Sequence, residues 1–151
     1  MRSPLSDAEK RELWGDFTDH EEEYLDEVEA RWGDTDAYAQ SARRVSRYGR
    51  EEWEQINQGN AAIEARIREL MDAGVEPSSP EAMDVAEAQR RHISRWFYEM
   101  DHAFHVQKSA LYVHEPKFRA GIERSTRPGA AEWLQIAIHA NADRHSTSTE
   151  R

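Results

Sequence analysis

The segment from Leu70 to Met100, LMDAGVEPSSPEAMDVAEAQRRHISRWFYEM, limits what this chain can fold into more than any other part of it. Gly74 is suited to a left-handed cap that ends one helix, while Ser79 and Pro80 offer an N-cap and a first-turn proline for the next. The second helix is expected to reach about Tyr98, in a dense aromatic cluster. We therefore predict a helical hairpin whose aromatic end favours a ligand pocket over a catalytic centre.

The helix before this turn is expected over Glu51–Ala73 and has the clearest pattern in the chain. Its apolar residues recur on one face at helical spacing, interrupted only at Asn60. The stripe consists of Trp53, Ile56, Ile63, Ile67, Leu70 and Met71. This pattern predicts a long helix that is buried along one face.

Shorter helices are expected on both sides of the hairpin. Ser6 followed by Glu9 forms a capping-box pattern, and Asp34 or Thr35 can cap a later helix. The other expected helical segments are Glu21–Trp32, a segment containing Tyr38, Ala42 and Val45, His102–His114, a shorter helical or irregular piece at Lys117–Ser125, and Pro128–Ala140. No stretch alternates with the period of a strand, so the predicted fold class is all-α.

The charge of the chain bears on its partners. Its 151 residues fit one domain, and they include 20 lysines and arginines against 30 aspartates and glutamates, a formal net charge of -10. Such a charge repels a phosphate backbone. We therefore expect no direct nucleic-acid binding by this chain.

Apolar runs and cysteines are missing from the sequence. No apolar run approaches the about 20 residues that span a bilayer, and the N-terminal sequence lacks the apolar centre of a signal peptide. We expect no membrane partner and a cytoplasmic location. Without cysteine there is no disulfide and no thiolate ligand, so any site chemistry must come from histidines, carboxylates, hydroxyls and aromatic surfaces.

Several motifs resemble one known family. They are WGDF at Trp14–Phe17, RWGDTDAYAQS at Arg31–Ser41, LYVHEPKF at Leu111–Phe118, and ERSTRPGAAEWLQIAIHANADRH near the C-terminus. Together with the hairpin segment they resemble the TipAS domain, the antibiotic-recognition domain of TipA-type regulators of the MerR family. The resemblance implies a compact, globin-like multi-helix domain with a cleft for large apolar peptide antibiotics, especially thiopeptides.

The resemblance also implies where the domain begins and ends. Residues 1–143 would form the antibiotic-binding domain, and its acidic first 48 residues would become ordered on the ligand. Residues 144–151 lack apolar periodicity and are expected to form a flexible tail. In the parent regulators a MerR-like winged helix-turn-helix and a coiled coil precede this domain. Nothing in this sequence corresponds to either, so we expect an isolated recognition domain from which the DNA-binding regulator segment is absent.

Met100 is a departure from the family pattern. A well-known member carries a cysteine at this position, and its thiol adds covalently to dehydroalanine groups of the antibiotic. A thioether is a poor nucleophile for that addition, whereas a thiolate is a competent one. We therefore predict reversible binding, with Met100 adapting to an irregular apolar ligand.

Aromatic, histidine and methionine side chains are the candidate ligand contacts. They are Trp32, Tyr38, Trp53, His92, Trp96, Phe97, Met100, Phe104, His105 and Tyr112. Aromatic faces can stack on thiazole-like rings. The competing interpretation is that these residues are ordinary core, because the cluster near Trp96 covers several helix faces.

Metal, haem and acid–base chemistry are weaker interpretations. His102 and His105 lie three residues apart, with Asp101 and His92 as further donors, but a zinc site needs a third ligand and usually a fourth. A haem ligand at His92 would sit beside charged Arg90 and Arg91. Acidic pairs such as Glu81/Asp84 and Glu51/Glu52 fit solvated helix faces. We therefore predict no metal, no cofactor and no enzymatic activity.

The predicted function is a non-catalytic recognition domain that binds a bulky peptide antibiotic. It would serve drug-responsive transcriptional regulation or antibiotic sequestration. The alternative is a helical protein-interaction domain whose groove takes an amphipathic helix from a partner protein.

Overall fold

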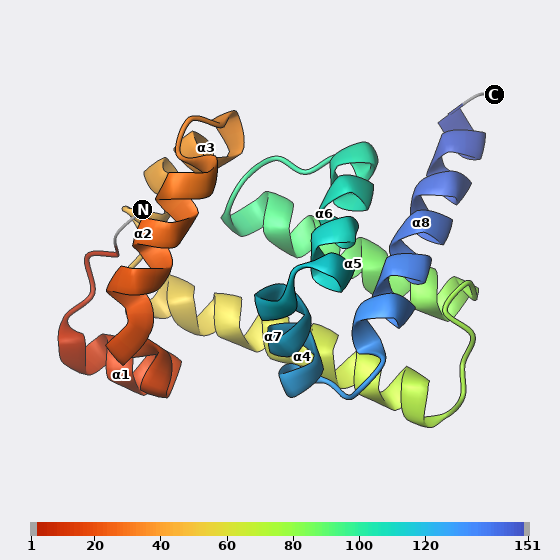
Figure 1. Cartoon of the computed structure of the whole chain (residues 1–151), viewed down its shortest axis with the longest axis horizontal. Helices are drawn as coiled ribbons and strands as arrows, with labels where there is room; N and C mark the ends of the chain where they lie inside the picture. The colour runs from red at the N-terminus through yellow and green to blue at the C-terminus, as the bar shows by residue number, and fades with distance from the viewer. Residues whose placement is uncertain (1–2, 150–151) are drawn as a thin grey trace. The chain divides into compact units, whose positions relative to one another are not determined.

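The structure, a computed structural model, describes residues 3–149, and in that range it contains only helices and their connections (Figure 1). The elements are α1 (Asp7–Trp14), the 3-10 helix η1 (Gly15–His20), α2 (Glu21–Trp32), α3 (Asp36–Val45), α4 (Arg50–Asp72), α5 (Pro80–Trp96), α6 (His102–His114), α7 (Pro116–Ser125) and α8 (Ala130–Thr149). The predicted all-α fold class is confirmed. No helix among the described residues is long and apolar enough to cross a membrane.

The local signals set most helix starts as predicted. The Ser6 hydroxyl accepts a hydrogen bond from the Glu9 amide at 3.2 Å, and the Glu9 carboxylate accepts one from the Ser6 amide at 3.1 Å, which completes the capping box of α1. Thr35 caps α3, and the Ser79 hydroxyl accepts from the Ala82 amide at 3.2 Å ahead of α5. Short side chains thus satisfy amides that a helix leaves unpaired.

The chain divides into two units. The N-terminal unit comprises residues up to Gly59 together with His92–Glu99, and the C-terminal unit comprises Asn60–Arg91 together with residues from Met100 onward. α4 and α5 therefore each contribute residues to both units. The predicted stripe on α4 is confirmed, but it serves two cores rather than one.

The core of the N-terminal unit is small and largely aromatic at its edge. Its buried members are Leu5, Val45, Trp53 and Ile56, and the residues packed against them are Leu13, Trp14, Tyr48, Trp96 and Phe97. α1 has no buried residue, and on α2 only the polar Glu21 is buried. Between these helices, Gly15 takes a φ of 57° and the chain forms the 3-10 helix η1, which the sequence pattern did not predict.

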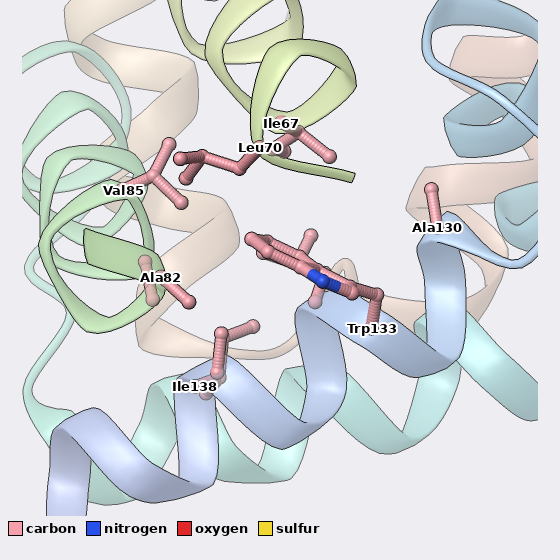
Figure 2. Packing of buried hydrophobic residues seen from close by; sticks show 10 residues of the cluster. Ile67, Leu70, Ala82, Val85, Ala130, Trp133 and Ile138 are labelled. Carbon is pink, nitrogen blue, oxygen red and sulfur yellow. The ribbon is translucent and has the colours of Figure 1, made fainter. Parts of the chain in front are cut away.

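The core of the C-terminal unit is larger and aliphatic (Figure 2). Trp133 of α8 lies among Ile67 and Leu70 of α4, and its indole N–H donates to the Val75 carbonyl at 3.1 Å. Several of its alanines are fully buried and let the helices approach closely: Ala82, Ala86, Ala130, Ala131 and Ala137. Gly74 has a φ of 72°, which confirms the predicted left-handed turn after α4.

α8 is longer than the sequence indicated. The predicted helix ended at Ala140, but α8 continues to Thr149 and takes in residues 144–149 of the expected tail. Long-range contacts extend it, because Arg144 donates to Asp84 of α5 at 3.1 Å. Residues 150 and 151 of that expected tail lie outside the described residues.

Candidate ligand-binding surface

Aromatic side chains of the N-terminal unit form a continuous series of edge contacts. In order, the series is Tyr24, Phe17, Trp14, Trp53, Tyr48 and Trp96, with centroid separations of 5.4, 6.1, 5.0, 6.1 and 5.5 Å. Phe97 joins at Trp53, at 6.2 Å. We call these seven residues the aromatic series. Edge-to-face geometry of this kind stabilises each pair by about 0.5–1.5 kcal/mol beyond simple burial.

One end of the aromatic series is exposed and its middle is buried. Phe17 and Tyr24 keep 40% and 45% of their surface open to solvent, whereas Trp53 keeps 9%, and Trp96 and Phe97 at the other end are half-buried. Exposed apolar side chains that lie in contact form a patch, and contiguous apolar patches mark sites where a ligand or partner docks. The series thus begins as an accessible surface and reaches the core at Trp53.

Two tyrosines near this end stay neutral. Tyr24 keeps 45% of its surface open, but the side that packs on the protein loses water, and this desolvation together with the Glu27 carboxylate raises its pKa. Burial together with the neighbouring Tyr24 raises the pKa of Tyr98 to about 12. Both phenols therefore offer a ligand an uncharged ring and, at neutral pH, a protonated hydroxyl.

Hydrogen bonds fix the end of α5 within the N-terminal unit. The Tyr48 hydroxyl donates to the Trp96 carbonyl at 2.6 Å, and Arg44 of α3 donates to the Ser94 carbonyl at 2.6 Å. The Glu99 amide donates to the side chain of Gln40 at 2.9 Å. These contacts position Trp96 and Phe97 through the backbone.

Two buried nitrogens of this unit have no hydrogen-bond partner in the part of the chain that the structure describes. They are Nε1 of Trp53 and Nε2 of His92. The His92 ring packs on Gly59, where an added Cβ would lie 2.5 Å from its Cε1 atom. Burial, assisted by Arg95, lowers the pKa of His92, so the ring is neutral at pH 7. Buried polar atoms left unpaired are costly, which makes them candidates for ligand contact.

The N-terminal unit also holds the candidate contacts Trp32 and Tyr38. The Trp32 ring is half-buried and lies under the Arg31 guanidinium, 4.5 Å from the ring centroid. Tyr38 of α3 is also half-buried. Of the ten predicted contacts, Trp53, Trp96 and Phe97 meet in the core of this unit, and Trp32, Tyr38 and His92 belong to the same unit.

The other four candidates belong to the C-terminal unit. Met100 and His105 are each only 1% exposed, so neither offers surface to a ligand in this conformation. The half-buried Phe104 ring lies under the Lys108 ammonium at 5.6 Å, and Tyr112 packs against the aliphatic core. All four were predicted as ligand contacts together with the N-terminal aromatics, and in the structure they belong to the C-terminal unit.

The two histidines considered as metal ligands, His102 and His105, have different partners. His105 faces Gln89, 2.7 Å from its side-chain oxygen, and burial together with Arg90 lowers the pKa of His105 to about 4. His102 instead lies 2.9 Å from Glu87. The donor set of His102, His105, Asp101 and His92 therefore does not assemble.

Glu87 is the centre of a polar cluster in the C-terminal unit. Its buried carboxylate accepts from Arg90, from Arg91 and from Asn141 of α8. Burial alone would raise the pKa of Glu87, but these hydrogen bonds, with one from His102, outweigh it and hold the pKa well below the usual range. Glu87 is therefore ionised at any physiological pH and joins α5, α6 and α8. Among the described residues, Glu87, His102 and His145 also form a group that could hold a metal ion.

Sequence reasoning missed Phe17 and Tyr24 as contact candidates. Phe17 lies in the WGDF motif and within the 3-10 helix η1, whereas Tyr24 lies on α2, so no single helical period puts the two on one face. The N-terminal unit offers a surface of aromatic rings. Stacking and hydrophobic burial are the interactions such a surface can make.

Comparisons with known proteins agree with this fold. The TipAS antibiotic-recognition domain matches residues 24–141. The HTH-type transcriptional activators TipA of Streptomyces coelicolor and Streptomyces lividans are 38% identical to this chain over 142 residues, or 94% of the chain. The chain spans about 55% of the length of each of these relatives.

Two solved structures are similar. TipAS of Streptomyces lividans in complex with nosiheptide, part of a thiopeptide antibiotic multidrug resistance system, gives a TM-score of 0.85 at 37% identity and covers 96% of this chain and 99% of its own. The antibiotic-binding domain of a TipA-class multidrug resistance transcriptional regulator gives 0.56 at 35% identity, over 62% of this chain and 99% of its own. The predicted resemblance is confirmed, and the chain belongs to the TipAS antibiotic-recognition domain family.

Proposed function

We propose that this chain is a non-catalytic recognition module that binds a bulky, largely apolar thiopeptide antibiotic on the aromatic series of its N-terminal unit. The observation that carries the proposal is the series itself, which runs from exposed Phe17 and Tyr24 to buried Trp53. Aromatic rings supply large contact area at low loss of side-chain entropy. Family membership supports the ligand class, because a similar domain is known in complex with nosiheptide.

Polar atoms near the series support a peptide-like ligand. The unpaired Nε1 of Trp53 needs an acceptor, and the hydroxyl of neutral Tyr24 can donate. A thiopeptide carries many carbonyls and ring nitrogens that accept such bonds. An apolar site with a few well-placed polar groups is the usual form of a small-molecule site.

Binding on this chain is reversible in our proposal. The chain has no cysteine, and Met100 is buried in the C-terminal unit. No thiolate is therefore available to add to a dehydroalanine. Met100, His105, Phe104 and Tyr112 remain predicted contacts, and the buried Met100 and His105 would require a ligand-induced rearrangement.

Ligand binding would also order the first 48 residues. α1 buries no residue and α2 buries only Glu21, which is held by an ion pair with Lys10 at 2.6 Å. Helices with so few buried contacts have little tertiary stabilisation of their own. A ligand stacked on Phe17 and Tyr24 would supply it, at the expense of ordering entropy.

The biological output in this proposal is drug-responsive regulation or sequestration in the cytoplasm. The TipA relatives are transcriptional activators of which this chain spans about 55%, so the DNA-binding function would come from another segment or another chain. The net charge of -10 agrees with this, because it would repel the phosphate backbone of DNA.

The direct test is a nosiheptide titration followed by tryptophan fluorescence and by intact mass in the same samples. Saturable quenching with unchanged denatured mass is the expected result. Phe17→Ala and Tyr24→Ala should each weaken binding about tenfold, as loss of a central aromatic contact does. Ile136→Ala is the matched control, since Ile136 is 47% exposed on α8 in the C-terminal unit. A stable mass increase would disprove reversibility, and equal affinities in all variants would disprove the site.

A groove between α4 and α5 favours the protein-interaction alternative. It has a volume of about 320 Å³ and is lined by Ala62, Ile63 and Arg66 of α4 and by Glu81, Asp84, Val85 and Ala88 of α5. An amphipathic helix from a partner could lie there. This alternative would replace the first if nosiheptide did not bind and if a single protein were captured stoichiometrically by the wild type but not by Val85→Asp.

A further inference from the structure

The two ends of the aromatic series lie among charges of opposite sign. Tyr24 lies on α2, whose 12 residues include six carboxylates and a single arginine. At the other end, the Trp96 ring contacts Tyr48, and residues 41–50 around Tyr48 hold four arginines and no carboxylate. Both ends belong to the N-terminal unit. A chain with a net charge of -10 thus gathers positive charge at one end of its proposed ligand surface.

The guanidinium of Arg95 lies over the ring of Trp96. Its Cζ atom is 4.8 Å from the ring centroid. Arg95 is exposed, and no carboxylate in the described part of the chain forms an ion pair with it. A guanidinium in this position keeps N–H donors that can bind a carboxylate or a similar anion in bidentate geometry. Arg95 can therefore receive an acidic group from a ligand that stacks on the neighbouring rings.

Arg44 of α3 is a second cation at this end. One of its nitrogens donates to the Ser94 carbonyl at 2.6 Å, which fixes the side chain next to the residue that precedes Arg95. Another nitrogen lies 3.3 Å from the carboxylate of Glu99, whose side chain is 76% exposed. An ion pair with so exposed a partner contributes little. An anion of the ligand can therefore take the place of Glu99.

Tyr48 shows that both guanidinium charges reach one place. Its ring centroid is 5.5 Å from that of Trp96, and its hydroxyl donates to the Trp96 carbonyl at 2.6 Å. Burial raises the pKa of Tyr48, and Glu52 adds to the rise, while the charges of Arg44 and Arg95 both oppose it. The positive field of the two arginines therefore extends over the last rings of the aromatic series.

We propose that the Trp96 end of the aromatic series is a subsite for an acidic group of the ligand, and that Arg95 is the residue that selects for it. This inference rests on the proposed function and narrows its ligand class to bulky aromatic antibiotics that carry a carboxylate or another anion at one end. The rings of the ligand stack on the series, and its anion accepts from Arg95. The carboxylates of α2 repel the same anion from the Tyr24 end, so charge sets the direction in which the ligand lies.

Two fluorescent dyes with the same aromatic skeleton test the subsite. Anilinonaphthalene sulfonate carries an anion, and phenylnaphthylamine is its neutral counterpart. In fluorescence titrations of the whole chain, Arg95→Gln should weaken binding of the sulfonate dye about fivefold, near the upper limit for an exposed ion pair, and leave the neutral dye unchanged. Arg95→Lys keeps the charge and should restore most of the affinity. Arg124→Gln is the matched control, because Arg124 is exposed on α7 in the C-terminal unit.

Glu99→Gln gives a second measurement in which binding should improve. The substitution removes the carboxylate that pairs with Arg44, so affinity for the sulfonate dye should rise severalfold while affinity for the neutral dye stays the same. Added salt should weaken binding of the sulfonate dye alone, since it screens exposed charges. A variant that merely damaged the fold would not bind more tightly.

Equal losses of both dyes in Arg95→Gln, or no loss of either, would overturn the inference. The nosiheptide titration is separate from this result. Saturable binding of nosiheptide together with either of those dye results would leave the proposed function standing without an acidic subsite. Selective loss of the sulfonate dye in a chain that does not bind nosiheptide would support the subsite and contradict a thiopeptide as its ligand.

Discussion

The two units of this chain are stabilised in different ways. The core of the C-terminal unit packs ten buried apolar residues, four of them alanines, so its helices lie close together. The N-terminal unit buries four and relies on ring edges, one end of which is open to solvent. Close packing of small residues resists deformation, while edge-stacked rings on weakly anchored helices can re-pack around a bound ligand. The N-terminal unit is therefore suited to the ligand binding that we propose, and the C-terminal unit to providing a rigid support for it.

The largest expected effect comes from opening a cavity in the C-terminal core. Leu134→Ala removes a side chain that is 1% exposed and should lower the free energy of unfolding by about 2–5 kcal/mol. Urea denaturation followed by circular dichroism measures it. Ile136→Ala, on the exposed face of the same helix, should change stability by less than about 0.5 kcal/mol. Similar values for the two variants would contradict the close packing assigned to this unit.

Acid should weaken the C-terminal unit through His105. Its native pKa of about 4 lies below the ordinary 6.5, so between these values the unfolded chain binds a proton that the native chain does not. The stabilising effect is complete above pH 6.5 and is lost as pH falls toward 4, by about 3 kcal/mol in all. His105→Gln should flatten the slope of stability against pH across this window. An unchanged slope would show that the buried ring is not the source.

Removing a helix cap should show that the two units differ in local stability. Ser6→Ala breaks the capping box of α1 at a cost of about 1 kcal/mol. Because α1 buries no residue, amide hydrogen exchange should rise in α1 and leave α8 unchanged. Antibiotic affinity should fall as well, if ligand must order this helix. Equal acceleration in both helices would instead show that the chain opens as one cooperative unit.

The smallest effect is expected at the contact between α4 and His92. Gly59→Ala gains helix propensity but pushes the imidazole outward, so the unfolding free energy should change by less than about 1 kcal/mol. The visible result should be a rise in the pKa of His92 toward its ordinary value, followed by NMR. Gly121→Ala is the matched control, since an added Cβ there meets nothing within 4 Å, and it should leave that pKa unchanged.

Structural features that depend on a few neighbouring residues could be predicted from the sequence. The Ser6 and Thr35 caps and the turn at Gly74 depend on neighbours in the chain, and each was found where expected. The extension of α8 could not be predicted, because contacts with other helices, such as Arg144 donating to Asp84 of α5, leave no signal in the local sequence. η1 was missed for a related reason, since a 3-10 helix has no apolar period to detect.

The candidate site was only partly predictable. Apolar spacing identified Trp53, Trp96 and Phe97 as residues that meet, but it could not distinguish a buried ring from an exposed one. Met100 therefore entered the list of contacts although it is buried. Glu87 and His145 carried no signal, because a carboxylate and an imidazole in separate helices become a donor set only through the fold.

The absence of a thiol has a consequence for signalling over time. A sensor that forms a covalent adduct records past exposure, because each captured molecule stays attached after the drug has gone. A chain without cysteine and with Met100 buried keeps no such record. Its occupancy would follow the concentration of free antibiotic in both directions, and the duration of any response would be set by the dissociation rate. This domain would report the antibiotic concentration at the time and not past exposure to the drug.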